Sequence, residues 1–191
     1  MSVMQHRRLR APGPPRTCWR ASAALRAGAL ASAALLALMP VAARAALSEA
    51  EAKVALVFNL IAFVDWPREL GQIRLCSIGA DDYAAQLRSL DGAQVAGLTL
   101  RERRLEPGES TRGCQVLFIA DTRAGRLRRH LEDAAPGTLT IADGIDAIQA
   151  GAIVGITIEQ QRLAFSINQT AARAGGLAIS AKLLRLARTV R

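Results

Sequence analysis

The sequence lacks the motifs by which common catalytic sites are recognised. It has no G-x-S-x-G nucleophile elbow, no G-x-x-x-x-G-K-[ST] phosphate loop and no G-x-G-x-x-G fingerprint. Histidine occurs only as His6 and His130, and none of the three cysteines belongs to a C-x-x-C pair. Structural zinc needs four ligands in a closed tetrahedral site. We therefore expect no enzyme activity, no metal and no cofactor.

Acidic residues are absent from the first 46 positions, which carry seven arginines. An apolar stretch runs from Ala27 to Met39, ends at Pro40 and is followed by Ala43-Arg44-Ala45. A basic start, a short apolar stretch and small residues at an A-x-A site are typical of a secretory signal peptide. The stretch is shorter than the ~20 apolar residues that cross a bilayer. We expect residues 1–45 to be removed on export and residues 46–191 to form one domain.

The formal net charge of +9 belongs mainly to this leader. Seven of the 25 Lys and Arg residues lie in it, which leaves 18 against 16 acidic residues in the rest of the chain. Nucleic-acid binding depends on a concentrated basic face. Only Arg123, Arg126, Arg128 and Arg129 lie close together, at a spacing typical of a solvated helix face. We expect no nucleic-acid partner.

Two cysteines, Cys76 and Cys114, remain after the leader. In an oxidising compartment such a pair is more often bonded than free. Closing the loop of 38 residues would stabilise the fold by about 4 kcal/mol in the chain-entropy model. The alternative, a metal or redox site, is weak because His130 is the only histidine left to join the pair.

The pattern of apolar residues predicts a single compact α/β domain with a mixed, mostly parallel sheet flanked by helices. The strands are expected at residues 72–78, 98–105, 114–120, 138–142, 152–158 and 163–167. The apolar run at 114–120 is typical of a central strand, whereas the charged residues 101–104 indicate an edge. Because only four residues, Glu159 to Arg162, separate the last two strands, they should form an antiparallel C-terminal hairpin.

Helices are expected between and around these strands. Ser48-Glu49-Ala50-Glu51 is a capping box, and its helix should continue to about Asp65, since Pro67 disfavours helical backbone in the residue before it. Further helices are predicted at 81–90 with Asp81-Asp82 as the cap, at 121–133, and from Asn168 to Gly175. A final helix should carry Ile179, Leu183, Leu186 and Val190 on one face.

The first helix is unusual because every residue from Val54 to Val64 except Asn59 is apolar. A helix without a polar face is either buried within its domain or contacts another chain. A buried amide needs hydrogen-bond partners, so we favour Asn59 being bound within the domain. Asp143 and Asp146 follow a predicted strand and are interpreted as a turn and a helix cap.

Several segments together resemble the YfiR family of periplasmic regulators. They include a Phe-Asn…Trp-Pro block at the front and a Ser-x-Lys-Leu block near the end. The segments are Val57 to Pro67, Leu75 to Gly79, Cys114 to Ile119, Leu163 to Asn168 and Leu177 to Ala187. In order and spacing they cover nearly the whole chain after the leader.

The resemblance implies a compact α/β domain, usually dimeric, that acts in the periplasm without known catalysis. The best understood members restrain a membrane-anchored diguanylate cyclase by binding its periplasmic portion. An outer-membrane lipoprotein or reducing conditions relieve that restraint. The resemblance also places the family's disulfide at Cys76 and Cys114. Some members carry a second cysteine pair in the region that matches Asp143 to Ala152, and this chain has none there.

Two functional hypotheses follow. In the first, the protein represses a diguanylate cyclase through residues of the first and last helices. The candidate partner-binding residues are Phe58, Asn59, Phe63, Trp66, Lys182, Leu183 and Leu186. In the second, it is a small-ligand sensor that works with a histidine kinase or a transporter. Its ligand would bind at the carboxyl ends of the strands, near Gly79 to Asp82 and Asp121 to Arg123.

Overall fold

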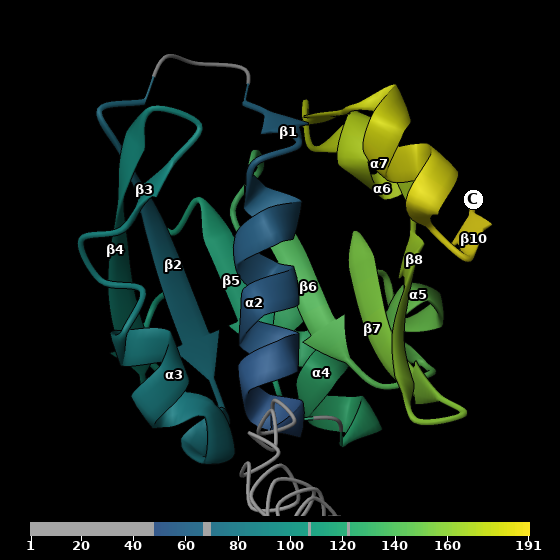
Figure 1. Ribbon diagram of the computed structural model, residues 1–191, viewed down its shortest axis with the longest axis horizontal. Helices are drawn as coiled ribbons and strands as arrows, with labels where there is room; N and C mark the ends of the chain where they lie inside the picture. Colours follow the sequence, from purple (N-terminus) through teal and green to yellow (C-terminus); the bar gives the residue numbers. More distant parts are fainter. Residues whose placement is uncertain (1–47, 67–69, 107, 122) are drawn as a thin grey trace, which may run out of the picture. The chain divides into compact units, whose positions relative to one another are not determined.

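An eight-stranded sheet forms the centre of the computed structural model, which describes residues 48–66, 70–106, 108–121 and 123–191 (Figure 1). The expected signal peptide and Pro67 lie outside the described residues. The strand order is β10-β8-β7-β6-β5-β2-β4-β3. The strands are β2 (Gln72–Ile78), β3 (Gln94–Val95), β4 (Leu98–Leu105), β5 (Val116–Ile119), β6 (Leu139–Asp143), β7 (Val154–Glu159), β8 (Arg162–Ile167) and β10 (Thr189–Val190).

Neighbouring strands are parallel except in the pairs β3–β4 and β7–β8. The antiparallel β7–β8 hairpin turns at Gln160 and Gln161, both with positive φ. The structure therefore confirms the mixed, mostly parallel sheet and its C-terminal hairpin. β3 pairs with β4 only at Leu98 and Thr99, so the charged part of β4 lies at an edge, as its composition indicated.

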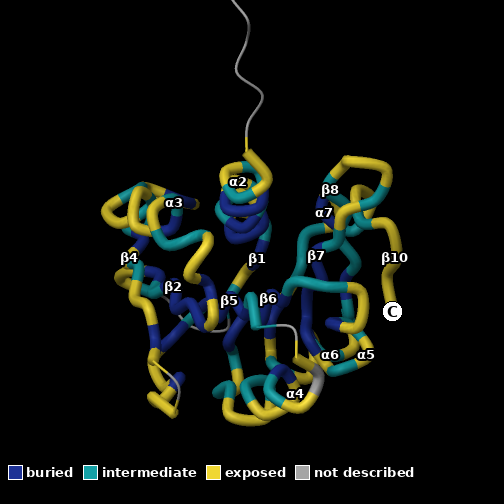
Figure 2. The backbone as a smooth tube through the Cα atoms, turned by 90° about the horizontal axis from the view of Figure 1, so that it is seen from below, coloured by how far each residue is buried: buried dark blue, intermediate teal, exposed yellow. Residues whose placement is uncertain are grey.

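Helices cover both faces of the sheet (Figures 1 and 2). The helices are α2 (Glu49–Ile61), α3 (Ala84–Arg88), α4 (Ala124–Glu132), α5 (Ala147–Ala150), α6 (Gln169–Ala174) and α7 (Ala181–Leu186), with a 3-10 turn at Asp81–Tyr83. α2 and α3 lie on one face, and α4 and α5 lie on the other. Along β5, Val116 and Phe118 join the core under α2, whereas Leu117 and Ile119 join the core under α4. Burial on both faces explains why this strand is a continuous apolar run.

Local capping signals are reproduced in the structure. The Ser48 N–H donates to Glu51 Oε2 at 2.8 Å, and the Glu51 N–H donates to Ser48 Oγ at 3.2 Å. Asn168 Oδ1 accepts from the N–H of Ala171 at 2.9 Å, which caps α6. The expected cap at Asp81 is wrong, because Ala80 occupies that position and the Asp81 carboxylate binds Arg104 instead.

Both terminal helices are shorter than predicted. α2 ends at Ile61, and Val64–Asp65 form β1, which pairs with β9 (Ala178–Ile179) in a separate two-stranded antiparallel sheet. α7 spans only Ala181–Leu186, so Ile179 before it and Val190 after it lie in strands rather than on its face. Strand pairing has overridden local helix propensity at both ends, between β1 and β9 and between β10 and β8. Within the described ranges, no helix is long and apolar enough to span a membrane.

Candidate functional site

The β1–β9 pairing brings the front and the end of the domain together at one end of the sheet (Figure 1). Val64 pairs with Ile179, Asp65 pairs with Ala178, and the Ser180 N–H donates to the Phe63 carbonyl at 3.0 Å. α7 begins directly after this last bond. Residues of the front block thus lie beside residues of the last helix, although far apart in the sequence.

Three of the predicted partner-binding residues, Phe63, Trp66 and Lys182, flank this junction, and a fourth, Leu186, lies one helical turn beyond Lys182 on α7. We call them the β1–β9 surface. Lys182 Nζ lies 5.3 Å from the centroid of the Phe63 ring, a cation–π contact that joins the two segments. Phe63 and Trp66 are half-buried, Lys182 is exposed, and 64% of Leu186 is exposed. Buried Trp66 Nε1 has no hydrogen-bond acceptor among the described residues.

The other three predicted residues have different environments. Leu183 is 4% exposed and belongs to the core. Phe58 is half-buried and packs against the same core. Asn59 is exposed, so the preferred expectation of a buried amide bound within the domain is wrong. It lies on the solvent side of α2, where an amide needs no protein partner.

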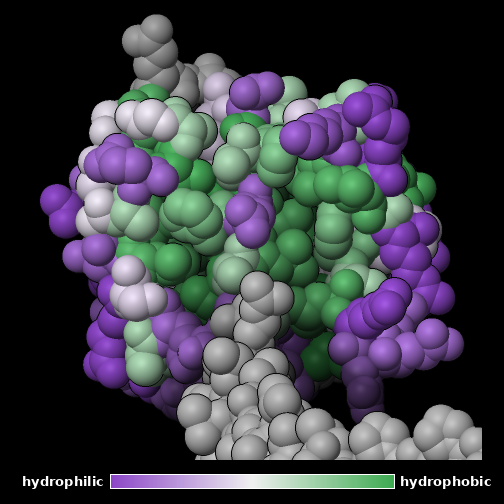
Figure 3. Space-filling model, in the orientation of Figure 1, coloured by the Kyte–Doolittle hydropathy of each residue, from purple (hydrophilic) through white to green (hydrophobic). Residues whose placement is uncertain are grey.

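Apolar side chains are visible across the middle of the α2 face of the molecule, with hydrophilic residues at its margins (Figure 3). A groove of about 550 Å³ on this side is lined by the start of α2 and the β7–β8 hairpin. Glu49 and Ala52 form one wall, and Ile158 and Leu163 lie on the other. Ile158 is 43% exposed. α2 thus leaves part of the sheet uncovered beside the β7–β8 hairpin. The apolar sequence of α2 therefore contributes to an apolar surface as well as to the core.

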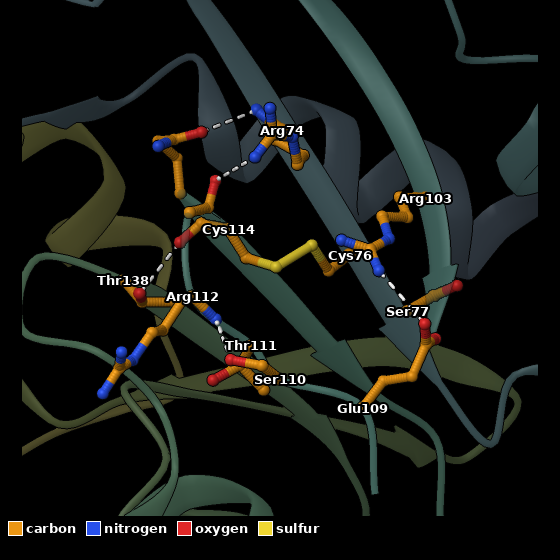
Figure 4. Close-up of a disulfide and its surroundings, with 12 residues drawn as sticks. Arg74, Cys76, Ser77, Arg103, Glu109, Ser110, Thr111, Arg112, Cys114 and Thr138 are labelled. Atoms are coloured by element: carbon orange, nitrogen blue, oxygen red, sulfur yellow. Dashed lines mark hydrogen bonds and ion pairs between the residues drawn. A yellow bond between two sulfur atoms is a disulfide. The ribbon is translucent and has the colours of Figure 1, made fainter. Parts of the chain in front are cut away.

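Cys76 and Cys114 form a disulfide on the opposite face, beneath the α4 side of the sheet (Figure 4). Their Cα atoms are 5.8 Å apart, and both residues are buried. Thr138 Oγ1 donates to the Cys114 carbonyl at 2.9 Å, and the Arg74 guanidinium donates to the Gly113 carbonyl at 3.2 Å. The bond joins β2 to the β4–β5 loop, two residues before β5 begins. The pairing expected from the cysteine count is present.

A second cavity, of about 340 Å³, lies at the carboxyl ends of β2, β4 and β5. β4 and β5 are the two neighbours of β2, so the chain changes direction across the sheet at this point. We call it the switch-point cavity. Its lining includes Gly79, Asp81, Asp121 and Arg123, which are the positions expected for a ligand under the sensor hypothesis. The sheet topology brings these two separate segments together.

A buried ionic cluster lies under the first turns of α2. Lys53 is 4% exposed, and its Nζ lies 2.7 Å from Asp143 Oδ2 and 2.8 Å from Glu49 Oε1. The Tyr83 hydroxyl lies 3.2 Å from Lys53 Nζ and 3.1 Å from Asp143 Oδ2. Burial acts to lower the pKa of Lys53, but its bonds to Asp143, Glu49 and Tyr83 outweigh burial and raise that pKa above its usual range. Burial also raises the pKa of Tyr83.

Sequence reasoning missed this cluster. Asp143 was interpreted as part of a turn, and no interaction between it and Lys53 was expected. A signal was nevertheless available, because Lys53 lies on the same helix side as Val57 and Leu60, which are both buried. A lysine on a buried helix face needs an acidic partner.

Comparison with known proteins identifies the family. Residues 50–188 match the model of the YfiR/HmsC-like family. The chain belongs to this family. The resemblance found in the sequence is therefore confirmed, and membership is consistent with periplasmic regulation in cyclic di-GMP signalling. A search of curated proteins gave no match.

Two solved structures share the fold of this YfiR/HmsC-like chain. A conserved domain protein from Vibrio cholerae O1 biovar eltor is 17% identical, with a TM-score of 0.50, over 76% of this chain and 61% of that one. The ABC domain from Streptococcus pneumonia in complex with L-Trp is 14% identical, with a TM-score of 0.51, over 74% of this chain and 60% of that one. The chain spans less than two thirds of either structure, and the likeness shows the fold alone.

Proposed function

We propose that this protein is a periplasmic regulator that represses a membrane-anchored diguanylate cyclase by binding its periplasmic portion. Membership of the YfiR/HmsC-like family supports a regulatory role. The observation that carries the proposal is the β1–β9 surface, where the front and end blocks of the family resemblance meet. A homodimer, and release by an outer-membrane lipoprotein, are further parts of the proposal.

The chemistry of this surface suits protein recognition. Stable interfaces have an apolar or aromatic centre with a polar rim. Phe63 and Trp66 supply half-buried aromatic rings, Leu186 supplies an exposed aliphatic side chain, and Lys182 supplies a charge beside them. Aromatic anchors in partly desolvated positions are the residues that commonly dominate binding energy.

Leu186→Glu tests the proposal without a large risk to the fold, because the side chain is already 64% exposed. Ile145→Glu is the matched control. Ile145 is 81% exposed and follows the carboxyl end of β6, away from the β1–β9 surface. Both variants should melt at the temperature of the unmodified protein, since neither introduces a charge into the core.

We expect deletion of the gene to raise cellular cyclic di-GMP and biofilm formation. Leu186→Glu should reproduce that rise, whereas Ile145→Glu should restore repression. With the purified periplasmic portion of the cyclase, calorimetry should show at least a tenfold weaker affinity for Leu186→Glu, as expected for a residue worth more than about 1.4 kcal/mol. Unchanged cyclic di-GMP after deletion would refute the proposed function. Equal behaviour of the two folded variants would refute the proposed surface.

A further inference from the structure

We propose that the switch-point cavity binds a small anion that carries a carboxylate or phosphate group. The cavity lies between α4 and the loop that joins β4 to β5, over the carboxyl ends of three parallel strands. In open α/β sheets, ligands bind in the crevice where the strand order reverses. A volume of about 340 Å³ lies within the range of small-molecule sites.

The α4 wall of the cavity carries the groups that would hold the anion. Arg123, Arg126 and Arg129 line it at intervals of three residues, which places them on one side of the helix. Arg123 and Arg126 share a single carboxylate, that of Asp121, at 2.8 and 3.1 Å. Asp133 is the other acidic residue of this wall. On this wall three guanidinium groups therefore meet two carboxylates, although the lining as a whole carries four arginines and five carboxylates.

Arg129 is the group best placed to bind the ligand. It forms no ion pair among the described residues, although it lines the cavity. His130, which is half-buried, lies beside it on the same wall. Guanidinium groups bind carboxylate and phosphate oxygens through two parallel hydrogen bonds. The arginines at 123–129 thus have a use beyond solvation of a helix face.

The carboxylates of the opposite wall already have partners and do not compete for these arginines. Glu109 Oε1 accepts from Arg103 at 3.1 Å, and its Oε2 accepts from the Glu106 N–H at 2.7 Å. The bond to the Glu106 N–H and the bond to Arg103 lower the pKa of Glu109. Arg104 pairs with Asp81 and lies 3.8 Å from Glu106. Three carboxylates of this wall thus share Arg103 and Arg104, and the guanidinium group left to bind an anion is that of Arg129 on the α4 side.

The cavity is formed before any ligand arrives. Thr111, buried in the β4–β5 loop, donates from its hydroxyl to the Asp133 carbonyl at 2.7 Å and so ties the loop to the end of α4. The disulfide at Cys114 fixes the end of the same loop to β2. At the floor, a Cβ on Gly79 would lie 2.7 Å from Asp121 Cβ, so the glycine permits a close approach that places this carboxylate. A preformed site binds without the cost of ordering its walls.

Binding of inorganic phosphate and of citrate to the mature protein tests the proposal, with choline as a cationic probe. Amide chemical shifts in NMR titrations would report both affinity and location. We expect at least one anion to bind with a dissociation constant below about 10 mM, with shifts at Gly79 and along α4. A preference for phosphate or for citrate would assign the ligand to the phosphate or the carboxylate class.

Arg129→Ala should weaken binding at least tenfold. Arg128→Ala is the matched control, because this exposed arginine belongs to the same helix but does not line the cavity. Both side chains are exposed, so both variants should stay folded. The proposal would be overturned if neither anion bound, if choline bound instead, or if the two variants were equally affected. Because the assay contains no cyclase, its failure would leave the proposed repression untouched.

Discussion

Replacing Lys53 by methionine should destabilise the domain by about 3–5 kcal/mol. Lys53 is 4% exposed, and its ammonium group is bound by Asp143 at 2.7 Å. Methionine matches the length of the aliphatic part of lysine but leaves the Asp143 carboxylate without its cation. The cost of an unpaired charge in a largely buried position exceeds the value of the packing that methionine retains.

Substitutions of the residues that bind Lys53 distinguish its buried ion pair with Asp143 from its exposed ion pair with Glu49. The Glu49 carboxylate is 60% exposed, so Glu49→Gln should cost less than about 0.5 kcal/mol, as for surface i,i+4 pairs. The Asp143 side chain is 16% exposed, so Asp143→Asn should cost several times more than Glu49→Gln. Tyr83→Phe removes one hydroxyl with two bonds and should cost about 0.5–1.5 kcal/mol.

Urea unfolding at several pH values measures these differences. Because the pKa of Lys53 is raised in the folded state, its pairing stabilises fully below the unfolded value of about 10.4 and is lost as the pH rises through the folded value. The gap between the unmodified protein and Lys53→Met should therefore be constant near neutrality and narrow only in strong alkali.

The control for this prediction is the double variant Lys53→Met/Asp143→Leu. It removes both charges and should recover most of the stability that Lys53→Met loses. A loss of less than about 1 kcal/mol for Lys53→Met would refute the reasoning from buried charge. So would equal losses for Glu49→Gln and Asp143→Asn.

Two further predictions concern the α4 side of the sheet. The Cys76→Ala/Cys114→Ala variant should lose about 4 kcal/mol in urea unfolding, since the bond closes a loop of 38 residues; a loss below about 1 kcal/mol would contradict the loop-closure account. Gly79→Ala should destabilise the domain more than Gly92→Ala. Both glycines have positive φ, which costs an alanine about 1–3 kcal/mol, but only at position 79 would the new Cβ also lie 2.7 Å from Asp121 Cβ. Equal melting temperatures for the two glycine variants would show that the strand ends can separate.

Elements that depend on local chemistry were predictable from the sequence. The capping box at Ser48 and the apolar strand at 116–119 can each be predicted from a few neighbouring residues. β1 and β9 were not predictable in this way, because each has two residues and exists only through the other. Val64 continues an apolar helical pattern, and nothing near it in the sequence indicates Ile179 as its partner.

The same limit applies to the candidate sites. Leu183 and Leu186 are three residues apart on one predicted helix face, yet one is 4% exposed and the other is 64% exposed. The difference arises because α7 ends at Leu186 and leaves that side chain beyond the core. The position of the switch-point cavity could be predicted, since it follows from the carboxyl ends of parallel strands. The pairing of Lys53 with Asp143 required knowledge of which strand end lies under α2.

The β1–β9 pairing also orders the events by which this fold can form. A polypeptide is synthesised from its N-terminus, so β1 exists long before the segment that holds β9 has been made. Until then, β1 has no strand to pair with, and non-local contacts of this kind form slowly. A chain interrupted before Ala178 would retain most of the sheet but leave β1 without its partner. The contact that closes the domain thus also distinguishes a finished polypeptide from an unfinished one.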